Sequence, residues 1–354
     1  MIFNKNDGLR YSLEKRFNDK KKEFPNDDVD YILFYKEIED YLNKNVHPET
    51  EKGALLHGDG LLTDHGVDHV AMVIQRAELL LGEKINHLSG FEIFILLLSI
   101  HLHDIGNIYG RDKHEENISK VVNDLNIMSR LQTPVLATIV NIATAHGGEY
   151  NFSKDTIISL PVSEYVEGIE IRPTILASIL RYADELAEDH TRAAKFLLNA
   201  NILKGKNRLY HNYSKTLEPI AITGDTVIYN FNIPIENIIN VSLLKEESKT
   251  NMDIYLYDEI LLRLCKSIRE LDYCKKYSQG FIILNAVKAK ISVYNKTAFN
   301  PLYSESIRLR LAGYPEQSNF TIDKLCENKL SFKNGYELKE HVLSIGEKDN
   351  VKPF

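Results

Sequence analysis

Cysteine is scarce in this chain of 354 residues, and the scarcity bears on its redox compartment. The three cysteines, Cys265, Cys274 and Cys326, form no closely spaced pair. An odd and sparse set excludes a disulfide-rich scaffold and offers no paired-cysteine motif for a metal or for redox chemistry. We therefore expect the protein to work in a reducing compartment, the cytoplasm.

The chain also lacks a long apolar run and an N-terminal signal segment. Its most apolar stretch, residues 91–100, is far shorter than the roughly 18 residues that a membrane-spanning helix needs. The opening residues, MIFNKNDGLRYSLEKRF, are charged almost from the start and contain no apolar signal core. We expect no association with a membrane.

Neither sign of charge is in large excess. The formal net charge is −7, and 44% hydrophobic with 26% charged residues is typical of a globular protein that buries a sizeable core. The mild acidity argues against a broad surface for long nucleic acid. The sequence contains no internal repeat, low-complexity tract or Gly/Ser linker, so a domain boundary must be inferred from a change in periodicity.

Histidine, by contrast, is concentrated in one part of the chain. Ten of the 12 histidines lie between His47 and His190. Histidines that served only as ordinary surface residues would be spread more evenly. The clustering therefore marks this part of the chain as chemically specialised.

Apolar residues recur at steps of three and four as far as about residue 196, which predicts a helical domain. The segment PNDD at 25–28 predicts a helix start, and Asp112 with Glu115 has the spacing of a capping box. The segment 91–104 is apolar nearly all round, which predicts a buried central helix. The other expected helices cover residues 31–42, 67–81, 112–125, 134–144 and 174–196.

The periodicity changes near residue 198. Beyond this point alternating apolar residues predict strands, and Gly224-Asp225 predicts a hairpin turn between two of them. A helix is expected over 253–276. The expected strands cover 208–213, 220–223, 227–233, 281–284 and 289–293.

These patterns predict a mainly α-helical protein with three parts. Residues 1–46 form a helical extension that packs on a helical domain over 47–198, and residues 199–354 form a smaller α+β region. The α+β region carries no recognised motif. Three roles stay open for it: shaping the pocket, forming a homo-oligomer, or binding another partner.

The adjacent pair His103-Asp104 ends the most apolar of the expected helices. A carboxylate buried beside an imidazole is costly unless something neutralises its charge. A metal ion does so directly, and nitrogen with carboxylate ligands suits Zn, Mn, Fe, Co or Ni, with Mg also compatible. The pair therefore predicts a divalent metal site.

Two further ligands are expected from other helices. His69 opens the helix over 67–81 and is followed at once by its apolar face, although His65 lies four residues earlier and is a rival. Asp184 follows a largely apolar helical stretch, with Glu185 or Asp189 as replacements. The order of ligands is then a His, a His-Asp pair and a distant Asp.

This ordered set resembles the HD superfamily of metal-dependent phosphohydrolases. The resemblance covers roughly residues 45–200 and implies an HD-type all-helical bundle over 47–198. It rests on four segments: DHGVDHVAMVIQRA at 64–77, LLSIHLHDIGNIYGRDKHEE at 97–116, IATAHGG at 142–148 and ILRYADELAEDHTRA at 179–193.

The resemblance also implies a ligand set. His69, His103, Asp104 and Asp184 match the four ligands of the family's primary metal. Members with two metals add two histidines between the HD pair and the last Asp, and His114 and His146 stand in those places. One or two divalent ions are therefore expected, with Asp104 bridging if there are two.

Asn107 departs from the family pattern. Many two-metal members carry Lys at this place, and members that hydrolyse dNTPs often carry His. The substitution prevents assignment to either subclass.

The expected reaction is hydrolysis of a phosphoester or phosphoanhydride bond through a metal-bound hydroxide, because a metal ion lowers the pKa of its bound water towards neutrality. The substrate is expected to be a nucleotide or a related small phosphorylated molecule. Asp104, Glu115 and Arg181 are the candidate catalytic residues. Glu115 and Glu149 are the two candidates for the general acid. Charged neighbours of the ligands are the candidate phosphate contacts: Arg111, Lys113, Arg181 and Arg192.

Two other functions stay open from the sequence. A cyclic-nucleotide or oligonucleotide phosphodiesterase would use the same metal ligands. A regulatory HD module that senses a nucleotide without turning it over would keep the ligands and lack activity. We assign no function to His57, His101 or His190.

Overall fold

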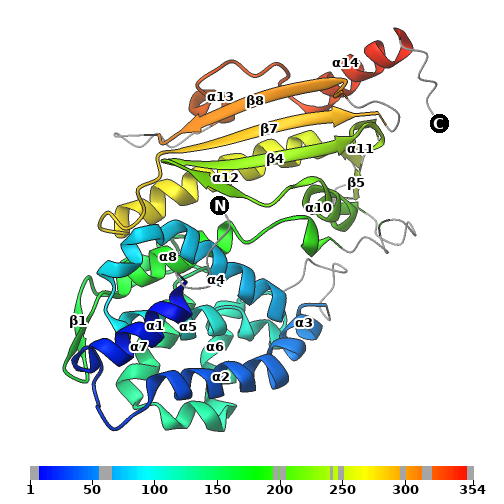
Figure 1. The fold of residues 1–354 in the computed structure, drawn as a ribbon. Helices are drawn as coiled ribbons and strands as arrows, with labels where there is room; N and C mark the ends of the chain where they lie inside the picture. Colours follow the sequence, from blue (N-terminus) through cyan, green and yellow to red (C-terminus); the bar gives the residue numbers. More distant parts are fainter. Residues whose placement is uncertain are drawn as a thin grey trace. The chain divides into compact units, whose positions relative to one another are not determined.

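The structure is a computed structural model, and it describes residues 8–55, 66–193, 198, 205–239, 242–245, 251–295, 300–312 and 321–348. The chain separates into two compact units (Figure 1). The helical unit comprises Met1–Gly58, Asp64–Ala187 and Tyr273–Ile283. The sheet unit comprises Asp59–Thr63, Glu188–Asp272 and Leu284–Phe354. A mainly helical fold with a small C-terminal sheet was predicted and is confirmed.

The helical unit begins with α1 (Leu9–Asp19), α2 (Tyr31–Asn45) and α3 (His47–Leu55). The apolar stripe predicted for α2 is the face that is buried. The predicted start at 25–28 is wrong, because the side chain of Asp30 caps α2 by accepting hydrogen bonds from the backbone N–H groups of Ile32 and Leu33.

The central helix of this unit is α5 (Gly90–Leu102), and every residue in it is buried. It starts with a capping box between Ser89 and Glu92. Among the described residues, the segment Gly90–Tyr109 is the one apolar and long enough to cross a membrane, but 94% of its apolar 18-residue window is buried within the protein. A core helix of a globular domain has the same composition.

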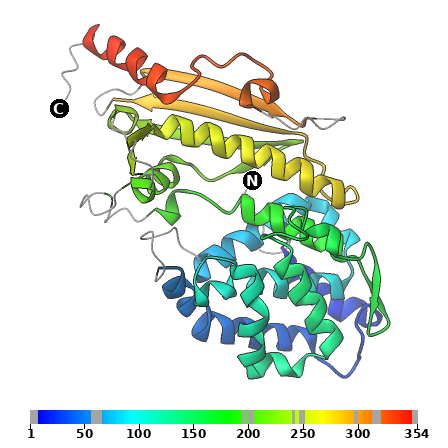
Figure 2. The same ribbon diagram turned by 180° about the vertical axis from the view of Figure 1, so that it is seen from behind.

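Further helices complete the helical unit, which Figure 2 shows from behind. They are α4 (Val67–Leu81), α6 (His114–Asp124), α7 (Thr133–Thr144) and α8 (Pro173–Glu185), with a short hairpin of β1 (Glu164–Val166) and β2 (Ile169–Ile171) before α8. The capping box predicted at Asp112 is wrong. Lys113, with φ of 53°, precedes α6, and no side chain caps the helix there.

The sheet unit holds a four-stranded sheet in the order β3-β4-β7-β8. The strands are β3 (Ala221–Thr223), β4 (Thr226–Pro234), β7 (Ala286–Tyr294) and β8 (Tyr303–Arg310), and β4 with β7 is the parallel pair. Helix α12 (Leu256–Tyr277) connects this pair, and its Ser267 hydroxyl lies 2.8 Å from the Tyr229 hydroxyl of β4. The predicted hairpin turn is confirmed at Gly224, where φ is 60°.

Two predicted strands are wrong. Residues 208–213 lie in a helix, α10 (Gly205–Thr216), where Leu209 and Tyr213 are buried at a spacing of four. His211 is buried as well, so every second side chain from Leu209 to Tyr213 is buried although the backbone is helical. Residues 281–284 form no strand, because the chain turns back on the end of α12: the backbone N–H of Phe281 donates to Ser278 O.

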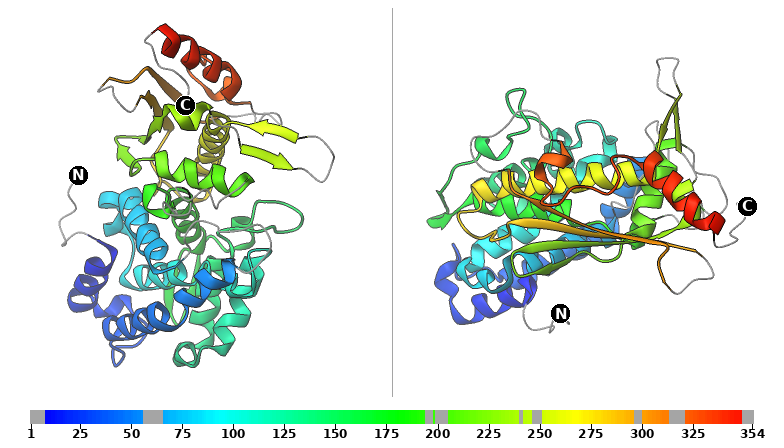
Figure 3. Two further views of the ribbon diagram at one scale, coloured as in Figure 1. Left: turned by 90° about the vertical axis from the view of Figure 1, so that its right-hand side faces the viewer. Right: turned by 90° about the horizontal axis from the view of Figure 1, so that it is seen from above.

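The remaining described elements of the sheet unit are short, apart from the last helix. The β5–β6 hairpin stands apart from the four-stranded sheet (Figure 3). The elements are α11 (Ile235–Ile239), β5 (Ser242–Lys245), β6 (Asn251–Ile254), α13 (Ile322–Leu325) and α14 (Gly335–Lys348).

A buried polar network joins the first helices to α5 through His101. His101 Nδ1 lies 3.2 Å from His47 Nε2, and His101 Nε2 lies 3.2 Å from the Tyr35 hydroxyl and 3.4 Å from Glu39 Oε1. Arg10 donates to Glu39 at 3.0 Å and neutralises the carboxylate. His101 is therefore part of a buried network of polar side chains.

The network predicts a loss of stability in acid. Burial, reinforced by the charge on His101, lowers the pKa of His47 to about 3. In the unfolded chain His47 takes up a proton near its ordinary pKa of about 6.5, so between these values the unfolded state binds more protons. Above pH 6.5, His47 costs the folded state no stability. As the pH drops from 6.5 towards 3, proton uptake by His47 in the unfolded chain lowers the free energy of unfolding by up to about 1.4 kcal/mol per pH unit.

Urea unfolding of the wild type and of His47→Gln at matched metal content, from pH 8 to pH 4, measures this contribution. We expect the free energy of unfolding of His47→Gln to fall less steeply below pH 6.5. Parallel curves for the two proteins would show that His47 is not held neutral in the folded state.

Candidate metal centre

The end of α5 places two ligand side chains at the middle of the helical unit. His103 still has helical dihedral angles, whereas Asp104, with φ of −106° and ψ of −2°, leaves the helix. The 3₁₀ turn η3 (Ile105–Tyr109) follows, closed by the backbone bond from Asn107 N–H to Asp104 O at 2.9 Å. The change of backbone direction lets adjacent residues offer ligand atoms to a common centre.

His69, His103 and Asp184 form the first triad of potential ligands. His69 Nε2 lies 3.3 Å from His103 Nε2 and 3.2 Å from Asp184 Oδ1, and His103 Nε2 lies 3.6 Å from that oxygen. Asp104 Oδ2 joins them at 3.4 Å from each Nε2. Helices α4 and α8 and the residues that follow α5 thus bring four donor atoms together.

Asp104, His114 and His146 form the second triad. The other carboxylate oxygen, Asp104 Oδ1, lies 3.2 Å from His114 Nε2 and 3.9 Å from His146 Nε2. The two Nε2 atoms are 3.3 Å apart. Asp104 therefore faces both triads, with one oxygen directed to each.

The spacing of these atoms fits divalent ions. Metal–ligand distances of about 2.1 Å in a tetrahedral site place neighbouring ligand atoms about 3.4 Å apart. The three contacts within the first triad and the two contacts of Asp104 Oδ2 with its histidines lie between 3.2 and 3.6 Å. Two of the three contacts in the second triad lie at 3.2 and 3.3 Å, and the third is longer.

The histidine tautomers also fit metal binding. Nδ1 of His103 lies 2.7 Å from Ile100 O, and Nδ1 of His146 lies 2.6 Å from Ala143 O. A carbonyl oxygen only accepts hydrogen bonds, so Nδ1 carries the proton in each ring. The Nε2 lone pairs of both rings are therefore free to bind a metal ion. Histidine ligands of metals commonly have such a hydrogen-bond acceptor at the other ring nitrogen.

The charges of the cluster show what a cation would neutralise. Burial alone would lower the pKa of His103, yet the Asp104 and Asp184 carboxylates raise it well above its ordinary value. Burial opposes ionisation of Asp184, but hydrogen bonds with His103 and His69 hold its pKa well below the usual range. Burial and the charge of His103 and His114 lower the pKa of His146 to about 4. A divalent ion would take the place of the proton shared by these groups.

Gly106 provides the space that brings α6 against the HD pair. A Cβ atom at this position would lie 1.9 Å from the backbone oxygen of His114. An alanine could fit only if the start of α6 moved, and with it the imidazole of His114.

We therefore expect Gly106→Ala to weaken binding of an ion at the second triad by at least about tenfold while the first triad keeps its ion, because a ligand shifted by a fraction of an ångström loses coordination geometry. Metal analysis after dialysis, with circular dichroism as a control for folding, would measure this. Unchanged retention of two ions would contradict the role given to Gly106. Gly168→Ala, where no atom lies within 4 Å of the added Cβ, is the matched control for a glycine substitution.

The rival ligands fall in different places. His65 and His57 lie outside the described residues. Asp189 accepts a hydrogen bond from the backbone N–H of Thr191 at 2.8 Å and so begins the 3₁₀ turn η6 (His190–Arg192). Neither Asp189 nor Glu185 belongs to a described metal-binding group, whereas Asp184 does.

Arg181, predicted to act on the substrate, has close protein partners. Its guanidinium donates to Thr156 Oγ1 at 2.9 Å and lies 4.4 Å from the ring centre of Tyr273. The Thr156 hydroxyl in turn donates to Ala145 O at 2.6 Å, next to His146. The hydrogen bonds from Arg181 through Thr156 to Ala145 hold the residues that follow α7 in place. No pattern in the sequence indicated this role for Arg181.

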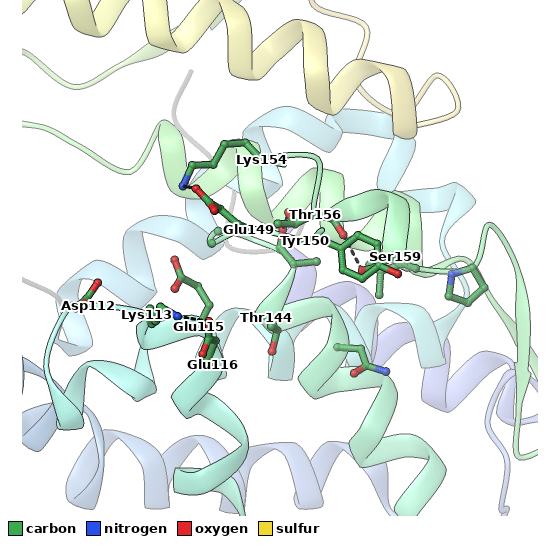
Figure 4. A pocket seen from close by; sticks show the side chains of 16 residues that line it. Asp112, Lys113, Glu115, Glu116, Thr144, Glu149, Tyr150, Lys154, Thr156 and Ser159 are labelled. Atoms are coloured by element: carbon green, nitrogen blue, oxygen red, sulfur yellow. Dashed lines mark hydrogen bonds and ion pairs between the residues drawn. The ribbon is translucent and has the colours of Figure 1, made fainter. Parts of the chain in front are cut away.

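A pocket of about 640 Å³ lies beside the second triad (Figure 4). Its walls include Glu115 and Gly147, the residues that follow the ligands His114 and His146. The ion pairs Lys113–Glu116 at 3.4 Å and Lys154–Glu149 at 3.2 Å lie on two of its sides. The candidate residues Lys113, Glu115 and Glu149 are thus brought together, and sequence reasoning did not foresee the pocket.

The last two candidate phosphate contacts lie elsewhere. Arg111 is exposed before α6 and is absent from the lining of the pocket. The side chain of Arg192 lies outside the described residues.

Comparison with known proteins agrees with this geometry. Residues 59–230 match the family model HD-CE. This segment is a domain of the HD superfamily. The HD-CE segment contains all six residues of the two triads, so the predicted resemblance is confirmed. No curated protein and no solved structure gives a significant match.

Proposed function

We propose that the protein is a metal-dependent phosphohydrolase that cleaves a phosphoester or phosphoanhydride bond of a nucleotide or a related small phosphorylated molecule. The observation that carries this proposal is the bridging position of Asp104, whose two oxygens each belong to a separate set of imidazole ligands. Such a pair of sites is the arrangement in which divalent ions act on phosphate groups. The HD-CE segment supports the same reaction class.

The donor set indicates what the ions would contribute. His69, His103, Asp104 and Asp184 would hold one ion, and Asp104, His114 and His146 the other. Bound there, divalent ions lower the pKa of water and neutralise the phosphate oxygens. Mixed imidazole and carboxylate donors suit Mn, Fe, Zn, Co or Ni.

The protein groups would bind and orient the substrate. The side chain of Asp184 is 31% exposed and that of His114 15%, whereas His69 and His103 are buried, so the triads are open on the Asp184 and His114 sides. The adjoining pocket has the size range of small-ligand sites. Lys113 lines this pocket, where its ammonium group would contact a phosphate of the substrate.

The direct test is a panel of mono-, di-, tri- and cyclic nucleotides with Mn²⁺ or another divalent ion. We expect Asp104→Asn to lower kcat/KM at least about 100-fold, because the amide loses the charge that both sites share. His87→Gln is a control, since the His87 imidazole lies outside both triads.

Turnover unaffected by Asp104→Asn would contradict the proposal. Release of a nucleoside monophosphate only from cyclic or oligomeric substrates would indicate the phosphodiesterase. Bound nucleotide with no turnover under any divalent ion would indicate the sensing module.

A further inference from the structure

Asn107 bonds to the bridging carboxylate of Asp104, although it belongs to neither triad. Its Nδ2–H donates to Asp104 Oδ1 at 3.1 Å. That oxygen faces the second triad, whereas Asp104 Oδ2 faces the first. Asn107 is 1% exposed, and its Oδ1 has no hydrogen-bond partner among the described residues. A buried amide oxygen without a hydrogen-bond donor lowers the stability of the folded protein. Its position therefore points to a hydrogen-bond donor that binds beside Asn107 Oδ1.

The two triads depend on Asp104 Oδ1 to different degrees. The first triad together with Asp104 Oδ2 offers four donor atoms, linked by contacts of 3.2 to 3.6 Å, and none of them is Oδ1. The second offers three, and among the described residues Oδ1 is the carboxylate oxygen that belongs to it. The second triad would therefore lose most of its negative charge if the carboxylate rotated, while the first keeps Asp184.

We propose that Asn107 is a positioning residue for the second ion: its amide N–H fixes the rotation of the Asp104 carboxylate so that Oδ1 faces His114 and His146. The unpartnered Asn107 Oδ1 accepts a hydrogen bond from a protic group that enters with that ion. The inference rests on the two-site arrangement used in the proposed function, but it concerns metal binding and does not require turnover.

The side chain can be changed without removing the turn that carries it. The turn is closed by main-chain bonds, Asn107 N–H to Asp104 O and Gly110 N–H to Asn107 O at 2.8 Å. Gly53 also packs against this backbone, because a Cβ there would lie 2.4 Å from Asn107 O. The backbone at 107 is therefore held independently of the amide.

The test is titration of the metal-depleted full chain with Mn²⁺, following free Mn²⁺ by electron paramagnetic resonance, with no substrate present. The wild type should bind two ions in separable steps. In Asn107→Leu, which keeps the size but removes the donor and the acceptor, the second step should weaken about 10- to 100-fold. The first step should stay within about threefold, and the spin-coupled signal of two adjacent Mn²⁺ ions should be lost at concentrations where the wild type shows it.

Two further variants secure the interpretation. Asn107→Ser replaces the amide by a hydroxyl too short to reach Asp104 and should show the same selective weakening if Asn107→Leu fails to fold. Asn141→Leu replaces an exposed asparagine of α7 and should leave both steps unchanged.

Three results would overturn the inference. They are equal weakening of both steps, an unchanged second step in both Asn107 variants, and a wild type that binds one ion only. A protein that binds two ions in this way but hydrolyses nothing would leave the inference intact and contradict the proposed function.

Discussion

A single carboxylate, that of Asp104, is the constraint on which the site depends. It is nearly buried, and its oxygens lie 3.2 to 3.9 Å from the Nε2 atoms of four histidines. A charge in such a place is costly unless ions or protons balance it. Four helices and the turn η3 converge on this residue, and the all-buried helix α5 holds it at the centre of the unit. The HD-CE domain can therefore be understood as a frame that holds one carboxylate between two triads of potential metal ligands.

Much of the frame could be predicted because helical periodicity is a local property. The stripe of α2 and the span of α4 follow directly from the positions of apolar residues. His69, His103, Asp104 and Asp184 could be placed because His and Asp side chains on buried helices are costly unless a cation balances them, whereas His114 and His146 were expected only from the resemblance to the HD superfamily. Helix ends were less accessible: Asp30 and Ser89 both cap helices, but only the structure shows which polar residue is in reach of the free N–H groups.

Other features could not be read from the sequence, since they depend on contacts between distant segments. Residues 208–213 were predicted to form a strand, yet Leu209, His211 and Tyr213 are buried on a helix. Arg181 was expected near the substrate from its distance to Asp184 along the chain, and its contacts with Thr156 and Tyr273 come from tertiary packing. Asn107 was seen only as a departure from a pattern, and its bond to Asp104 gives that departure a physical meaning.

A crystal of the Mn²⁺-loaded protein, with an anomalous difference map at the metal edge, tests the central claim most directly because it counts the ions and identifies their ligands together. The bridging geometry predicts two peaks on opposite sides of the Asp104 carboxylate, one against His69, His103 and Asp184, and the other against His114 and His146. An ion bound without Asp104, or no ion at either triad, would contradict it.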